Sequence, residues 1–289
     1  MFLDVLIDSV IDTLKIIPFL FVTYLIMEYL ESKTEDHSQN FLSAAGKYGP
    51  LLGGLIGIIP QCGFSAAAAS FYSGGVITLG TMTAVFLSTS DEMLPILISE
   101  AAGVERIIRI MAVKMILAVI TGFAVDLITH IVRISTGNKK HIHDLCEREH
   151  CGCDEEEGGG IFMPALKHTL HITFFIFVLS LIIGLLVEGV GEQNVSAFLE
   201  DQTIIGIVLA ALIGLIPNCA ASVMITEFYI NGILGSGQMM AGLMVSAGVG
   251  LLVLFRTNRN MKENIIAAAV LFASGIFWGS VITFTGITF

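Results

Sequence analysis

Two cysteines occupy equivalent places in two copies of one apolar segment. The first copy reads LIGIIPQC at 55–62, and the second reads LIGLIPNC at 212–219, 157 positions later. Between positions 55 and 82, 12 of 28 residues are identical at this offset. Thiolates bind soft metals and arsenic(III)-type centres far better than they bind hard ions. The repeated segment therefore carries chemistry suited to a thiophilic substrate.

Each cysteine follows a proline and a carboxamide. Proline removes a helical hydrogen bond and clashes with the preceding turn, so it breaks or kinks a membrane helix. The freed backbone groups are tolerated in a membrane only where they line a cavity or are buried in protein. In transporters with duplicated halves, the substrate site lies where two such breaks meet. We therefore predict a substrate-binding set of Cys62, Cys219, Gln61, Asn218, Pro60 and Pro217.

A second set is acidic and lies inside an otherwise apolar run. The segment STSDE at 88–92 has the counterpart VSAGV at 245–249, which carries no acid. Charges within a membrane span are costly and commonly mark an ion path or a proton relay. The alternative is that these acids lie near the membrane surface, at the end of their span. The predicted ion-coupling set is Asp91, Glu92, Ser88, Ser90 and Glu227.

A third cluster lies between the two copies. Positions 141–153 read HIHDLCEREHCGC, with three histidines and three cysteines, and acidic residues follow at once. These residue types match the ligand preferences of zinc and other thiophilic ions, although no two-plus-two finger spacing is present. The alternative is a solvated linker with an accidental cluster. The candidate metal ligands are His141, His143, Cys146, His150, Cys151 and Cys153.

Composition places these residues in a membrane protein. Hydrophobic residues make up 55% of the chain, charged residues 13%, and the mean hydropathy is +0.85. A soluble domain of this size could not bury so much apolar surface. The net charge is -11, and the few basic residues do not cluster with aromatic ones, so nucleic acid is not an expected partner. The expected surroundings are membrane lipid.

Eight apolar runs are long enough to build membrane helices. They lie at about 10–30, 48–73, 76–99, 108–132, 161–187, 203–230, 232–255 and 264–287. The repeats predict a first membrane repeat at 1–135, a His/Cys-rich acidic cytoplasmic linker at 136–161, and a second membrane repeat at 162–289. The fold class is thus an all-α polytopic membrane protein with about four to five helical segments in each repeat, broken at Pro60 and Pro217.

The number of crossings in each repeat decides the topology. One kinked helix at each proline gives parallel repeats, whereas two short helices give inverted ones. Lysine and arginine prefer cytoplasmic loops. Inverted repeats with the linker inside place ten of the chain's 14 lysines and arginines on the cytoplasmic side. The exceptions are Arg106, Arg109, Lys15 and Lys114. The parallel arrangement places only about seven there. We therefore expect inverted repeats, with both termini facing outward.

Taken together, the Pro-Gln-Cys and Pro-Asn-Cys breaks, the STSDE segment, the His/Cys-rich linker and the duplicated layout resemble a known family. They are similar to the ten-transmembrane heavy-metal exporters, also labelled arsenic efflux proteins or manganese transporters, and more distantly to organoarsenical permeases. The resemblance implies an exporter of the inner cell membrane with about ten helical segments. It also implies that Cys62 and Cys219 are the substrate thiols.

The predicted function is secondary active export of a thiophilic heavy metal or metalloid, coupled to protons. No Gly-x-x-x-x-Gly-Lys-Ser/Thr stretch occurs, so ATP coupling within this chain is not expected. A transporter rather than an enzyme is predicted. One alternative is a transporter of manganese or another divalent cation that uses carboxylates. Another is a membrane thiol oxidoreductase, and a third is a metal sensor acting through the linker. No cofactor is obligatory, linker-bound zinc is a candidate, and a homodimer stays open.

Overall fold

The computed structural model describes residues 38–131 except 61, 91 and 92, residues 203–289, and scattered positions in 6–25 and 162–182. Throughout these residues the regular structure is helical, without strands. The helices of the first half are α2 (Ser38–Gly57), α3 (Cys62–Ser73), α4 (Leu79–Ser88), α5 (Met93–Ser99) and α6 (Val104–Ile131). Those of the second half are α10 (Thr203–Gly214), α11 (Cys219–Ile230), α12 (Ser236–Val245), α13 (Val249–Thr257) and α14 (Met261–Thr285).

The two halves repeat one helical arrangement. Helices α3, α4 and α6 begin 157 positions before α11, α12 and α14. Within the first half α2 packs against α4 and α6, and within the second half α10 packs against α12 and α14 in the same way. The two copies of the sequence therefore fold alike.

The same turn ends α3 and α11. Gly75 and Gly232 have φ values of 75° and 76°, a left-handed conformation that glycine adopts without a Cβ penalty. In the first turn the amides of Gly75 and Val76 donate to the carbonyls of Tyr72 and Phe71, at 3.0 and 2.8 Å. The second turn has the same pattern, which is that of a Schellman motif. This motif explains why Phe-Tyr-x-x-Gly occurs in both halves.

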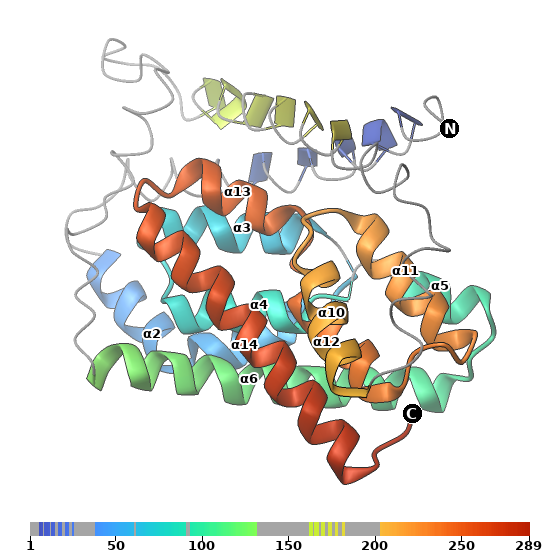
Figure 1. Ribbon diagram of the computed structural model, residues 1–289. Coiled ribbons are helices and arrows are strands. Elements are labelled where there is room, and N and C mark those ends of the chain that lie inside the picture. The colour runs from blue at the N-terminus through green and yellow to red at the C-terminus, as the bar shows by residue number, and fades with distance from the viewer. Residues whose placement is uncertain are drawn as a thin grey trace.

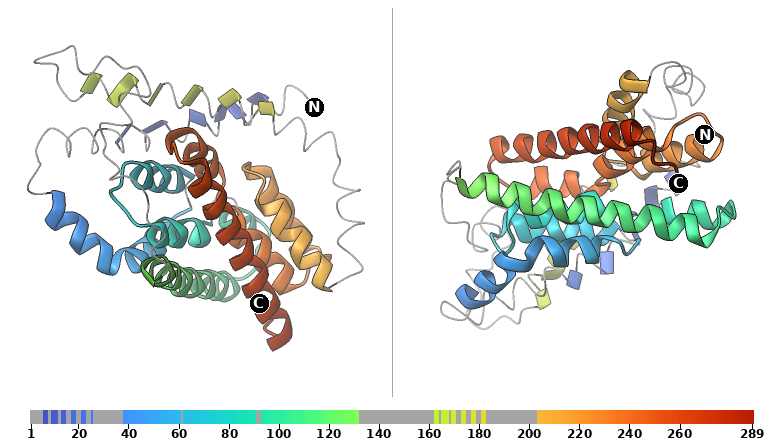
Figure 2. Two further views of the ribbon diagram at one scale, coloured as in Figure 1. Left: turned by 60° about the vertical axis from the view of Figure 1, so that its left-hand side comes forward. Right: turned by 90° about the horizontal axis from the view of Figure 1, so that it is seen from below.

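Three helical segments are long and apolar enough to cross a membrane, by length and composition. They are Val104–Ile131, Ser236–Thr257 and Met261–Thr285. The segment Ser236–Thr257 comprises α12 and α13 and is largely buried in the protein, whereas α6 and α14 leave most of their surface exposed. Figure 2 shows α6 and α14 as the two long helices at one side of the molecule. The interior of the protein is therefore built around short helices.

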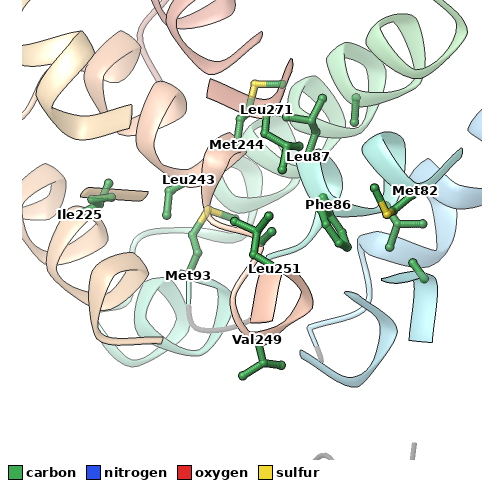
Figure 3. Close-up of a cluster of buried hydrophobic side chains, with 14 of the residues drawn as sticks. Met82, Phe86, Leu87, Met93, Ile225, Leu243, Met244, Val249, Leu251 and Leu271 are labelled. Atoms are coloured by element: carbon green, nitrogen blue, oxygen red, sulfur yellow. The ribbon is translucent and has the colours of Figure 1, made fainter. Parts of the chain in front are cut away.

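In the core, helices of each half pack against helices of the other half. Helix α3 packs against α13 of the other half, and α11 packs against α5, as Figure 1 shows. The central cluster includes Met93 of α5, Leu243 of α12 and Leu251 of α13, which lie close together in Figure 3. Because each half contributes to the other's core, the halves form one folding unit.

One hydrogen bond joins equivalent positions of the two halves. The indole Nε1 of Trp278 donates to Oγ1 of Thr121 at 2.8 Å, and these positions are 157 apart. A contact between two equivalent positions is the signature of a two-fold relation. The contact is the kind that a two-fold relation between the halves would produce.

Glycines allow α4 and α6 to cross closely. A Cβ atom on Gly122 would lie 2.7 Å from the carbonyl oxygen of Gly80 and 2.9 Å from the Cβ atoms of Ala84 and Pro50. The second half repeats this crossing, because a Cβ on Gly279 would lie 2.6 Å from the carbonyl oxygen of Gly237. Small residues at helix crossings are the usual means of close packing in membranes.

Replacing Gly122 with leucine is expected to separate α4 from α6 and to destabilise the protein by at least ~1–3 kcal/mol, the usual cost of overpacking. The measurement is the apparent Tm of purified protein in detergent. The matched control is Ala124→Leu, which adds the same side chain two positions away on the exposed face of α6. Equal Tm values for the two variants would contradict the close crossing.

Candidate functional site

The central feature of the interior is an interrupted helix in each half. Helix α4 ends at Ser88 and α5 begins at Met93, while α12 ends at Val245 and α13 begins at Val249. Thr89 and Ser246, which are 157 positions apart, are 3% and 7% exposed. Both interruptions therefore lie inside the protein rather than at its surface.

Hydroxyl groups add hydrogen bonds at the end of α4. Ser88 Oγ donates to the carbonyl of Ala84 at 2.8 Å, and Thr89 Oγ1 donates at 2.7 Å to that of Val85, which also accepts from the amide of Thr89 at 3.0 Å. Ser90 Oγ donates at 3.1 Å to the carbonyl of Ser88, one of the last carbonyls, which lack partners within a helix. Such groups are costly to leave bare in an apolar interior, so the hydroxyl of Ser90 helps α4 to end inside the protein.

A lysine reaches the same interruption. Lys114 lies in the middle of α6 and is 1% exposed, and its Nζ donates a hydrogen bond to the carbonyl of Thr89. Its counterpart in the second half is Leu271, also 1% exposed. A buried ammonium group is tolerated only when it is hydrogen-bonded or paired. The first half therefore places a cation where the second half has an aliphatic side chain.

The second interruption depends on a glycine. Gly248 precedes α13 with φ 51° and ψ −137°, a conformation that residues with a Cβ rarely adopt. Its counterpart in the first half is Asp91. The chain thus turns between α12 and α13 by means of glycine.

A small cavity lies between the two interruptions, with room for about one water molecule. Its lining comes from both halves and comprises Thr89, Ser90, Met93, Lys114, Ser222, Leu243, Ser246 and Gly248. Four hydroxyl-bearing residues and Lys114 thus contribute to its lining. This arrangement can hold a small polar or charged species between the two interruptions.

The predicted substrate-binding residues lie at helix ends. Cys62 and Cys219 are the first residues of α3 and α11, and Pro60 and Pro217 lie in the connections before them. Pro60 is exposed, while Pro217 and Asn218 are half-buried, and none of the three lines the cavity. Ser222, one turn after Cys219, does line it. Gln61 and the side chains of Cys62 and Cys219 lie outside the described residues.

The predicted ion-coupling residues lie in several places. Ser90 lines the cavity, whereas the hydroxyl of Ser88 is bonded back to its own helix. Glu227 is half-buried on α11 and is not part of the lining. Asp91 and Glu92 lie outside the described residues, directly after Ser90 in sequence. The predicted ligands of the linker, from His141 to Cys153, also lie outside them.

Sequence reasoning assigned no role to Lys114, Ser222 or Ser246. A signal was available for Lys114, because it is a single lysine deep inside the apolar run 108–132. Intramembrane ionisable groups mark functional sites by default. For the serines the sequence offered only their equivalent places in the repeat.

A separate polar network surrounds Glu263 at the start of α14. Its carboxylate accepts hydrogen bonds from Tyr72 Oη at 3.2 Å, Asn258 Nδ2 at 3.3 Å and Asn260 Nδ2 at 3.0 Å. Asn258 also donates to Asn264 Oδ1 at 2.7 Å. The counterpart of Glu263 is the exposed Arg106, so the equivalent position of the first half carries no carboxylate. It ties α3 to the connection between α13 and α14.

The long apolar helices and the buried polar cavity define a polytopic membrane protein of the transporter class. Comparison with protein families identifies the family. The family described as "Putative, 10TM heavy-metal exporter" matches residues 2–192. The chain belongs to this family and is a multi-pass membrane protein. The assignment made from the sequence is therefore confirmed. No curated protein and no solved structure gives a significant match.

Replacing Glu263 with glutamine is expected to destabilise the protein by about 2 kcal/mol, because the new amide brings donors to a site already surrounded by donors. The measurement is denaturant unfolding in detergent micelles. The matched control is Glu105→Gln in the first turn of α6, where the exposed Glu105 pairs with Arg109 on the surface. Equal midpoints for the two variants would show that the network does not tie α3 to α14.

Proposed function

We propose that the chain is a secondary active exporter of a thiophilic heavy metal or metalloid, coupled to protons. The observation that carries the proposal is the pair of interrupted helices facing one small polar cavity, in a chain of the heavy-metal exporter family. Interrupted membrane helices of two related halves are a common site of substrate and coupling-ion binding in secondary transporters.

The thiophilic character of the substrate rests on Cys62 and Cys219. These residues begin α3 and α11, and α11 carries Ser222 into the cavity one turn later. Substrate bound at the thiol of Cys219 would therefore be about one helical turn from the polar cavity. Soft thiol ligands select arsenic(III) species, zinc, cadmium or mercury over manganese.

In the proposed mechanism, alternating access uses the packing of helices of one half against helices of the other half. Because α3 packs on α13 and α11 packs on α5, each mobile unit would contain helices of both halves. The contact between Thr121 and Trp278 supports a two-fold relation. The excess of lysine and arginine on one side favours an axis in the membrane plane, and hence inverted repeats. Rocking of one unit against the other would open the cavity to alternate sides.

One observation favours a second candidate, the transport of manganese or another hard divalent cation. The cavity is lined by hydroxyl oxygens, and Asp91 and Glu92 directly follow Ser90 in sequence. Hard cations prefer oxygen ligands. In this case the cysteines would be dispensable, and the carboxylates would not.

Replacing Cys62 or Cys219 with serine is expected to reduce arsenite or cadmium flux to background, because the thiols are the proposed substrate ligands. The measurement is uptake into proteoliposomes of fixed orientation, with manganese assayed in parallel. Cys146→Ser in the linker is the matched control and should retain flux. Manganese flux that is indifferent to Cys62 and Cys219 would favour the hard-cation alternative instead.

Replacing Asp91 with asparagine is expected to remove the dependence of transport on a pH gradient, since the amide can no longer relay a proton along the path to the site. Flux is recorded with and without an imposed gradient in the same proteoliposomes. Asp144→Asn in the linker serves as the control for loss of an aspartate. An unchanged response to the gradient would exclude Asp91 from coupling.

A further inference from the structure

We propose that the interruption between α4 and α5 is a site for a monovalent coupling cation, and that the ammonium group of Lys114 is its built-in occupant and proton carrier. This inference deepens the proposed function and rests on it. It identifies the group that carries the coupling proton, which the acidic residues alone do not.

The chemistry of the interruption suits a cation. A helix C-terminus carries partial negative charge on its last carbonyls. In interrupted transporter helices such carbonyls commonly coordinate the coupling Na⁺ or H⁺. Here the carbonyl of Thr89 accepts a hydrogen bond from Lys114 Nζ, so the ammonium group occupies the position that a coupling cation would take.

The cavity supplies further oxygen ligands. The hydroxyls of Ser90, Ser222 and Ser246 line it together with Lys114. An ammonium group has three donors and no acceptor, and hydroxyl and carbonyl oxygens are suitable partners for it. Because the space holds about one water molecule, the ammonium group and a second cation would not fit together.

Charged residues other than Lys114 occur on α6 and on further elements of the chain. On α6 itself, Arg109 lies five positions before it and is exposed, while Asp126 binds Thr78 and the amide of Gly80 at the start of α4. From the neighbouring helices, α2 carries Lys47 and α11 carries Glu227, and the α4–α5 connection carries Asp91 and Glu92. The two acids of the connection are closest in sequence to the carbonyl that Lys114 binds.

The second half contains no equivalent charge. Leu271 replaces Lys114 at the equivalent position, and Gly248 replaces Asp91. Each chain therefore carries one such coupling lysine. The duplicated scaffold also provides the natural substitution for a test, because leucine is already buried at the equivalent place.

The proton step balances as an acid–base exchange. In the inward-facing state one N–H bond of the ammonium group breaks, its electron pair stays on nitrogen, and the proton leaves to water on the cytoplasmic side. The neutral amine releases the Thr89 carbonyl while substrate binds. In the outward-facing state substrate leaves, and the amine takes a proton from external water. One proton thus enters for each substrate exported.

The first arm of the test does not depend on export. Lys114→Ala removes the ammonium group and leaves the oxygen ligands. Sodium chloride is then expected to raise the Tm of the variant relative to choline chloride at equal ionic strength, and to leave the wild-type Tm unchanged. Lys114→Leu, which fills the space, should not respond to sodium. A folded Lys114→Ala protein without a sodium response would overturn the cation site.

The second arm measures coupling with cadmium ion in proteoliposomes held at zero membrane potential. A gradient of ~1 pH unit is expected to sustain about a tenfold extra cadmium accumulation in the wild type for one-for-one exchange. In Lys114→Leu this gradient-driven part should vanish while cadmium exchange at equal pH persists. Leu271→Met is the matched control and should accumulate cadmium like the wild type.

The outcomes of the two arms separate the hypotheses. Full gradient-driven accumulation by Lys114→Leu would overturn Lys114 as the proton carrier and leave the exporter proposal intact. Absence of cadmium flux in the wild type would count against the proposed function for this ion, while the sodium arm would still decide whether the interruption binds a cation.

Discussion

The main physical constraint on this structure is that a helix ends inside an apolar interior. The carbonyls at the end of α4 cannot reach water, and bare carbonyls would cost several kcal/mol each in such surroundings. The hydroxyl of Ser90 binds the carbonyl of Ser88, and the ammonium group of Lys114 binds the carbonyl of Thr89. The close glycine crossing of α4 and α6 brings the lysine within reach, because α6 must lie directly against α4. The polar cavity is thus a consequence of how the interruption is satisfied.

The sequence duplication explains the repeated helices and turns, but it does not explain where the charged residues lie. The starts of α3, α4 and α6, the Schellman turns and the glycine crossings recur at an offset of 157, whereas the charged groups do not. Lys114 has the counterpart Leu271, and Glu263 has the counterpart Arg106. In the proposed mechanism, a symmetric scaffold would supply two equivalent interruptions that exchange roles during alternating access. Unequal charges then allow one of them to carry a coupling ion, which a fully symmetric protein could not do with a single site.

The sequence predicted the features that are local or repeated. Hydropathy predicted an all-helical membrane protein, and the shared motifs predicted the family, and both are confirmed. The cavity was not predicted, because proline is what makes a helix break visible in a sequence, and Pro60 and Pro217 do not line the cavity. The interruption after Ser88 contains no proline, and it is stabilised by Lys114, 25 positions away in the chain from Thr89. Such a contact depends on the helix crossing, which hydropathy does not encode. The assignments of Cys62, Cys219 and the linker ligands stay predictions.

Helix α11 connects one of the thiol positions to the polar cavity. This connection bears on how substrate transport and proton transport could be coupled. Helix α11 begins at Cys219, carries Ser222 into the cavity and packs against α5, the helix that follows the interruption. A soft substrate bound at the start of α11 would shift the same helix that supplies a ligand to the cavity. Since packed interiors move between discrete arrangements rather than deforming smoothly, occupancy at one end of this turn would alter the fit of the ammonium group at the other. Coupling would then need no long pathway, because one helical turn separates the two sites.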